Sequence, residues 1–143
     1  MNVAQVVDRL RSDREFCRNL TVWRTLPERP PVLTDFPEGL EPRLVEGMRK
    51  RGIEHLYSHQ YDAVAAALAG DNVCVVTPTA SGKTLCYNLP VLNKIIANPQ
   101  ARALYLFPTK ALSQDQVTEL TSTVEDLDLR IGAYTFDGDT PST

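Results

Sequence analysis

Residues 73–84 read Val-Cys-Val-Val-Thr-Pro-Thr-Ala-Ser-Gly-Lys-Thr, and this stretch decides how the rest of the sequence is interpreted. Four consecutive apolar residues at 73–76, with turn-forming residues on either side, predict a β-strand buried on both faces, as in a parallel sheet. The residues after the loop predict a helix over 83–96, kinked at Pro90. A strand, a tight loop and a helix in this order favour an anion, because backbone N–H groups and the positive end of the helix dipole converge on the loop.

The loop differs from the P-loop pattern G-x-x-x-x-G-K-[ST] only at its first position, where Thr77 replaces glycine. Gly82 would let the backbone approach a phosphate closely. Lys83 would place a positive charge at the β and γ phosphates, and the Thr84 hydroxyl would ligate Mg²⁺. A chance Ser-Gly-Lys-Thr string in a surface loop is the alternative, but it would not require the flanking strand and helix. We therefore expect ATP and Mg²⁺ as cofactors, held by the residues Thr79, Ala80, Ser81, Gly82, Lys83 and Thr84.

Downstream of the loop, the pattern of strand and helix continues. Apolar runs predict two further buried strands at 103–107 and 130–134, and a helix runs between them from Lys110 to about Leu120. The order strand, helix, strand, helix, strand predicts an α/β fold with a parallel sheet and right-handed crossovers.

Upstream, apolar spacing predicts an amphipathic helix over residues 3–20. Two shorter helices should follow. The first begins at Pro42 and ends at Gly52, and the second takes Ser58 as its N-cap and ends at Gly70.

Prolines are dense between residues 26 and 42, which excludes a continuous helix or central strand there. We interpret this segment as an extended strap over the domain surface, anchored by Trp23, Leu33 and Phe36. The sequence thus predicts an N-terminal helix with a proline-rich strap at 1–41, and a truncated nucleotide-binding domain at 42–143.

The composition is that of a soluble globular protein, with 43% hydrophobic and 23% charged residues. The formal net charge of -3 gives no support for a nucleic-acid partner, so such a partner must be argued from a local site. Three irregularly spaced cysteines form neither a disulfide framework nor a metal motif. No signal peptide and no apolar run of roughly 20 residues is present, so we expect a cytoplasmic protein without a membrane partner.

The loop at 77–84 resembles motif I of superfamily 2 helicases of the DEAD/DEAH type. Upstream, Gly-Ile-Glu-His-Leu-Tyr-Ser-His-Gln at 52–60 is similar to the Q motif of these helicases. Downstream, Phe-Pro-Thr-Lys-Ala-Leu-Ser-Gln-Asp-Gln at 107–116 resembles motif Ia. Within this superfamily, the stretches at 56–60 and 78–92 and Phe-Asp-Gly-Asp-Thr-Pro at 136–141 together most resemble the DNA-repair helicases of the mitomycin-repair and RecQ-like group. The resemblance runs from about Phe36 to the C-terminus and implies a partial RecA-like P-loop NTPase domain.

The resemblance also implies roles for individual residues. Gln60 would read the adenine edge, since a carboxamide offers both a donor and an acceptor. Thr109 and Lys110 would contact the nucleic-acid backbone, which implies a nucleic-acid partner, DNA rather than RNA. Stacking on the base by Tyr57 or Phe36 and ordinary packing of these rings stay open as alternatives. The Asp137–Thr140 stretch could line the same groove or form a structural turn.

The Asp-Glu pair of motif II, the arginine finger and the second motor domain are absent from these residues. We therefore assign no catalytic residue and expect the N-terminal portion of a DNA helicase that binds ATP without hydrolysing it alone. Its partners would include the remaining helicase domains of a longer protein. Two other functions stay open: a catalytically dead nucleotide-binding or interaction module, and another P-loop enzyme such as a small-molecule kinase. A reading frame that continues beyond Thr143 into an apolar strand ending in Asp-Glu would favour the helicase.

Overall fold

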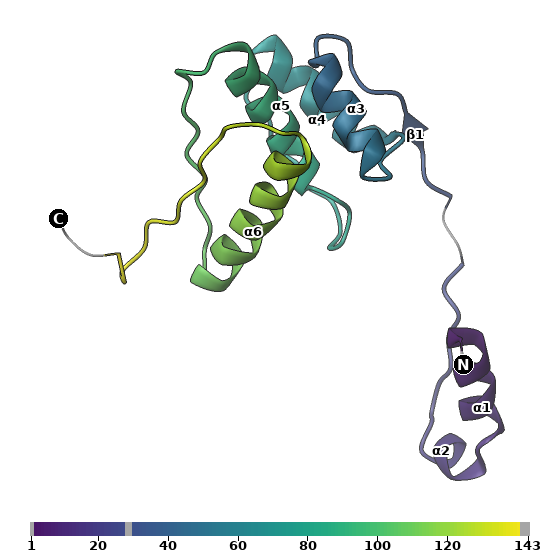
Figure 1. Cartoon of the computed structure of the whole chain (residues 1–143). Helices are drawn as coiled ribbons and strands as arrows, with labels where there is room; N and C mark the ends of the chain where they lie inside the picture. The colour runs from purple at the N-terminus through teal and green to yellow at the C-terminus, as the bar shows by residue number, and fades with distance from the viewer. Residues whose placement is uncertain (1, 28–29, 141–143) are drawn as a thin grey trace. The chain divides into compact units, whose positions relative to one another are not determined.

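The computed structural model describes residues 2–27 and 30–140. It divides into two compact units, Met1–Pro30 and Pro31–Thr143 (Figure 1). The domain boundary expected between residues 41 and 42 stays a prediction. Pro141, the last residue of the predicted repair-helicase stretch, lies outside the described residues, as do the other residues of 141–143.

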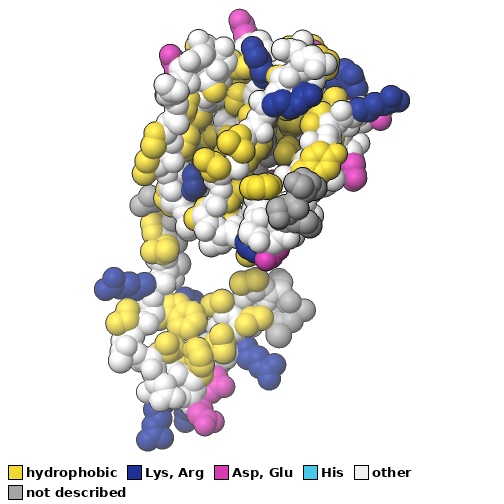
Figure 2. Space-filling model, turned by 90° about the vertical axis from the view of Figure 1, so that its left-hand side faces the viewer, with side chains coloured by type: hydrophobic (Ala, Val, Ile, Leu, Met, Phe, Trp, Pro, Cys, Tyr) yellow, Lys and Arg dark blue, Asp and Glu magenta, His cyan; other side chains and the backbone are white. Residues whose placement is uncertain are grey.

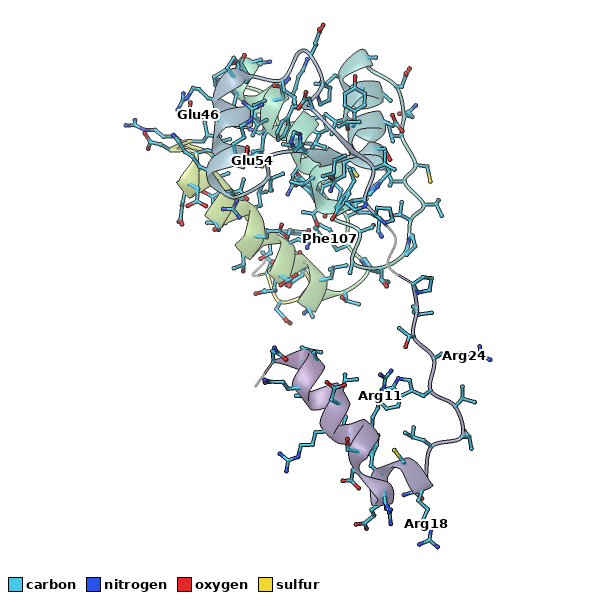
Figure 3. All side chains as sticks on the ribbon, turned by 90° about the vertical axis from the view of Figure 1, so that its right-hand side faces the viewer. Arg11, Arg18, Arg24, Glu46, Glu54 and Phe107 are labelled. Atoms are coloured by element: carbon cyan, nitrogen blue, oxygen red, sulfur yellow. The ribbon has the colours of Figure 1, made fainter. Side chains whose placement is uncertain are left out.

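The first unit contains two helices, α1 (Val3–Ser12) and α2 (Arg14–Arg18). The prediction of a single helix over 3–20 is therefore wrong, because Asp13 ends the first helix and begins the second. One carboxylate oxygen of Asp13 accepts the N–H groups of Glu15 and Phe16, at 2.9 and 3.0 Å, and so caps the second helix. Trp23 packs within this unit, where the Arg11 guanidinium lies 4.8 Å from its ring centroid (Arg11 is labelled in Figure 3).

The second unit is built on four helices: α3 (Pro42–Lys50), α4 (Ser58–Ala69), α5 (Thr84–Ala97) and α6 (Lys110–Asp126). Helix α4 packs along α5, which also contacts α3 (Figure 1). Each helix contributes apolar side chains to one core, whose buried members are Leu40, Leu44, Met48, Leu56, Val64, Leu89, Leu92, Val124 and Leu127. Among the described residues, no helix combines the length and the apolar character needed to cross a bilayer.

The two glycines predicted to end helices do so, whereas the N-cap of α4 is not the predicted residue. Gly52 and Gly70 adopt φ values of 82° and 91°, the left-handed conformation that ends α3 and α4. Ser58, however, is the first residue of α4, and Tyr57 is its N-cap. The Gln60 side chain, at the third position of the helix, accepts the N–H of this N-cap residue at 2.8 Å.

Two short strands pair near the start of this unit. β1 (Leu33–Thr34) and β2 (Leu56–Tyr57) are antiparallel, with Leu33 opposite Tyr57 and Thr34 opposite Leu56. This pairing fixes part of the proline-rich strap beside the segment that resembles the Q motif.

The three strands predicted at 73–76, 103–107 and 130–134 are not strands in the described part of the chain, and the predicted parallel sheet is not seen there. Burial nevertheless alternates along residues 74–77, 104–107 and 129–136. Tyr105 and Phe107 are half-buried, whereas Leu104 and Leu106 are 86% and 84% exposed. A period of two is typical of extended backbone with one covered side.

Burial on both faces was therefore the wrong prediction. A strand requires hydrogen-bonding neighbours, and none of the described segments supplies them to these stretches. Figure 2 shows the molecule from the side on which the stretches at 103–107 and 130–134 lie in Figure 1. Hydrophobic side chains are spread over the surface on that side.

Candidate functional site

The loop at 77–83 connects an extended segment to the first residue of α5, as the sequence predicted for a phosphate-binding junction. Two of its residues, Ala80 and Gly82, adopt positive φ values of 57° and 70°. A Cβ at position 82 would also lie 2.5 Å from Nε2 of Gln60, so a larger residue there would displace the Gln60 side chain. The loop is thus curled by left-handed residues and held close to α4.

The Lys83 ammonium lies within the curl of this loop. Its Nζ donates to the carbonyl oxygens of Pro78 at 2.8 Å and Thr77 at 3.2 Å, and to the Ser81 hydroxyl at 3.2 Å. The Thr77 hydroxyl lies 3.3 Å from the same nitrogen and 2.6 Å from the Ser81 hydroxyl. A cation, two hydroxyls and the N-terminus of a helix are the donors that an anionic phosphate group needs, so the residues present fit such a group.

Helix α4 holds this loop through two side chains. The Gln60 Nε2 donates to the Gly82 carbonyl at 2.8 Å, and His59 Nε2 donates to the Ser81 carbonyl at 2.9 Å. A carbonyl oxygen can only accept, so this ring nitrogen of His59 carries the proton. The segment that resembles the Q motif is therefore hydrogen-bonded directly to the loop at 77–83. His59 was not predicted, and its position beside Gln60 was the only sequence signal for it.

The two aromatic rings proposed for stacking have different surroundings. Tyr57 is 43% exposed and stacks on the His59 ring, with centroids 5.7 Å apart and planes 9° apart. Phe36 packs against the hydrophobic core, and the Arg49 guanidinium lies 5.9 Å from its ring. These contacts favour packing for Phe36 and leave one face of the Tyr57 ring for another group.

A hydrogen-bonded connection also joins α5 to α6. The Gln116 Oε1 accepts the Tyr87 hydroxyl at 2.6 Å and the Thr84 hydroxyl at 3.4 Å. Gln116 was not predicted as a site residue, although it lies seven residues after Thr109, or about two helical turns.

Tyr105 extends this polar region toward the segment that carries Phe107, which is labelled in Figure 3. Its hydroxyl donates to Oδ1 of Asn88 at 3.0 Å. Burial, with a smaller effect from Tyr87, raises the pKa of Tyr105 to about 12. The hydroxyl therefore keeps its proton and its hydrogen bond at neutral pH.

Thr109 and Lys110 lie at the start of α6, apart from the loop. Thr109 is the N-cap, and its hydroxyl accepts the Leu112 N–H at 3.3 Å. Lys110 forms an ion pair with Asp139, and its Nζ lies 4.0 Å from Asp137. The predicted site residues therefore form two groups: the loop with Gln60, and the N-terminus of α6.

The aspartates that pair with Lys110 belong to a structured turn. The Asp137 carboxylate accepts the Asp139 N–H at 2.9 Å, and the Thr140 hydroxyl accepts the Asp137 N–H at 3.0 Å. These bonds favour the structural reading of the Asp137–Thr140 stretch. In the described ranges, no group of three or more His, Cys, Asp or Glu side chains could hold a metal ion.

Cysteine reactivity gives a direct test of how α5 packs in the second unit. Cys86 in α5 is buried, and that burial raises the pKa of its thiol, whereas Cys74 is exposed. Because the thiolate is the reactive form, iodoacetamide at pH 8 is expected to modify Cys74 at least about ten times faster than Cys86. Mass spectrometry of the modified peptides measures both rates, and the chain in urea is the control, in which the rates should converge. Equal rates in the folded chain would contradict this arrangement of α5.

Comparison with known proteins identifies the family. Residues 57–143 match the DEAD/DEAH box helicase family. The chain belongs to this family. The helicase chain is 46% identical over 129 residues to the uncharacterized ATP-dependent helicase YprA of Bacillus subtilis, a match covering 90% of this chain and 17% of the relative. It is 32% identical over 148 residues to the ATP-dependent helicase HRQ1 of Saccharomyces cerevisiae, covering 96% of this chain and 13% of the relative.

A solved structure supports the same assignment. The helicase chain superimposes on the DUF1998 helicase MrfA bound to DNA and AMPPNP with a TM-score of 0.83 and 41% identity, covering 99% of this chain and 19% of that one. The predicted superfamily and the narrower helicase likeness are confirmed, and the chain matches part of a helicase fold. It spans less than a fifth of the length of these relatives.

Proposed function

We propose that this helicase chain is the ATP-binding N-terminal portion of an ATP-dependent DNA helicase. The observation that carries the proposal is the Lys83 ammonium inside a curled loop at the start of α5, with Gln60 bonded to the same loop. Two relatives are named ATP-dependent helicases, and the similar MrfA structure holds DNA and the ATP analogue AMPPNP.

In this proposal the loop binds the triphosphate. Main-chain N–H groups of Thr79, Ala80 and Ser81 face the phosphates, and Gly82 keeps that approach open. Lys83 exchanges its loop oxygens for the β and γ phosphate oxygens, a stronger set of acceptors because they are charged.

Thr84 and Gln60 complete the nucleotide site. The Thr84 hydroxyl is a hard oxygen donor at the first position of α5 and suits Mg²⁺, which when bound would neutralise charge on the phosphates. Gln60 is buried and uses one amide N–H and one oxygen lone pair within the protein, and its second N–H and lone pair would bind the adenine edge.

Nucleic acid would bind at the start of α6. A DNA phosphate would replace Asp139 beside Lys110, and the helix N-terminus would add its dipole. We assign no catalytic residue to this chain. Hydrolysis and strand separation would belong to the longer protein, in the cytoplasm, with its remaining helicase domains.

ATP hydrolysis by that longer protein, with and without single-stranded DNA, tests the proposal. DNA is expected to stimulate hydrolysis, and single-stranded RNA should stimulate it less. Lys110→Ala should raise the DNA concentration needed for half-maximal stimulation about tenfold, because one phosphate contact is lost. Lys50→Ala is the matched control, since Lys50 is also an exposed lysine paired with a carboxylate, Glu46, but lies in α3. Hydrolysis that no nucleic acid stimulates would contradict the helicase assignment.

A further inference from the structure

Gln116 joins the two groups of candidate site residues. Its Oε1 accepts hydrogen bonds from the hydroxyl groups of Thr84 and Tyr87, which lie one turn apart on α5. Gln116 itself belongs to α6, whose first turn carries Lys110 and whose N-cap is Thr109. Within the described ranges, these are the only hydrogen bonds between α5 and α6.

The chemistry of the Thr84 hydroxyl explains why an acceptor is needed there. A hydroxyl that gives an oxygen lone pair to a metal ion still carries its proton, and that proton needs a partner. Side chains that orient a metal ligand in this way typically change metal affinity about 10–100-fold when they are removed. Among the described residues, the half-buried Gln116 carbonyl is the acceptor that lies in reach of this proton, at 3.4 Å.

The carbonyl is also held in place by a second donor. The Tyr87 hydroxyl lies 2.6 Å from it, and the Tyr87 ring meets the Tyr105 ring edge-on, with centroids 5.7 Å apart. Tyr105 belongs to the segment that leads into α6. Its ring therefore supports the Tyr87 ring, whose hydroxyl holds the Gln116 carbonyl. A shift of α6 along its axis would withdraw Oε1 from Thr84.

We propose that Gln116 is a positioning residue that couples nucleotide binding to nucleic-acid binding. This inference rests on the proposed function. Gln116 orients the Thr84 hydroxyl toward Mg²⁺ when α6 is in place, and nucleic acid at Thr109 and Lys110 holds α6 in place. Mg²⁺-bound nucleotide on one side and nucleic acid on the other then favour the same position of α6. Each ligand therefore raises the affinity for the other by the same factor.

The test uses the full-length helicase and the variant Gln116→Leu, which removes the acceptor at similar size. Affinity for a fluorescent ADP analogue is measured in Mg²⁺ and in EDTA, and affinity for labelled single-stranded DNA with and without AMPPNP. The gain in ADP affinity from Mg²⁺ should fall about tenfold, with affinity in EDTA unchanged. The factor by which AMPPNP raises the affinity for DNA should fall toward 1, which means that AMPPNP no longer strengthens DNA binding.

Three further variants separate coupling from folding. Gln114→Leu, an exposed glutamine on the same helix, should keep both gains. Gln116→Glu keeps an acceptor oxygen and should also keep them. If Gln116→Leu proves unfolded by thermal denaturation, Gln116→Asn, whose carbonyl is withdrawn by one methylene, should show a partial loss of both gains.

The outcomes distinguish this inference from the proposed function. Wild-type gains in Gln116→Leu or Gln116→Asn, or equal losses of ADP affinity in Mg²⁺ and EDTA, would overturn the positioning role alone. A wild-type protein that binds neither nucleotide nor DNA would overturn the proposed function, and the coupling with it.

Discussion

Lys83→Ala is expected to lower the ATP affinity that we propose for this protein about 100-fold. The Lys83 ammonium lies inside the loop at 77–83, which we propose binds phosphate, and it contacts oxygens from Thr77, Pro78 and Ser81. A hydrogen bond to a charged group contributes about 1.5–3 kcal/mol, and every 1.4 kcal/mol is about tenfold in affinity. Titration with a fluorescent ATP analogue in Mg²⁺ measures the change.

Lys94→Ala is the matched control for this variant, because Lys94 is an exposed lysine near the other end of α5. It should bind ATP as the unchanged protein does. Thermal denaturation of both variants shows whether the loop still folds without its internal cation. A folded Lys83→Ala protein with unchanged ATP affinity would refute the phosphate-binding role of the loop.

The second large effect concerns stability. Leu44→Ala is expected to lower the free energy of unfolding of the 143-residue chain by about 3 kcal/mol. Leu44 is 0% exposed and packs in the core shared by α3, α4, α5 and α6, so its truncation leaves a cavity. Since domains are stable by only about 5–15 kcal/mol, this loss is a large share of the total.

Urea unfolding followed by circular dichroism measures the difference. Leu33→Ala is the control, because Leu33 is 49% exposed in β1 and its truncation should cost less than about 1 kcal/mol. Equal unfolding midpoints for the two variants would contradict the placement of the core around α3.

The region around position 47 shows how the core constrains the sequence. A Cβ at Gly47 would lie 1.7 Å from Cδ2 of Leu127, which follows the end of α6. Helix α3 and the end of α6 thus approach closely only because position 47 lacks a side chain. The sequence predicted α6 to end near Leu120, but packing of Val124 and Leu127 against the core extends it to Asp126.

Some features followed from the sequence because their causes are local. The position of the loop, the helix after it and the helix ends at Gly52 and Gly70 depend on residues within a few positions of each other. The same is true of the stretches from 52 to 116 that resemble helicase motifs, which is why the family was predicted correctly.

Other features depended on residues far apart in the chain. Whether an apolar run becomes a strand depends on a neighbour to accept its hydrogen bonds, so 73–76 and 103–107 could not be settled from their own residues. His59 reaches a carbonyl 22 residues away, Gln116 a hydroxyl 32 residues away and Lys110 a carboxylate 29 residues away. Sequence alone determined the position of the loop before α5 and the family of the chain. Only the tertiary structure decided which side chains hold that loop, because such contacts depend on how separate helices pack.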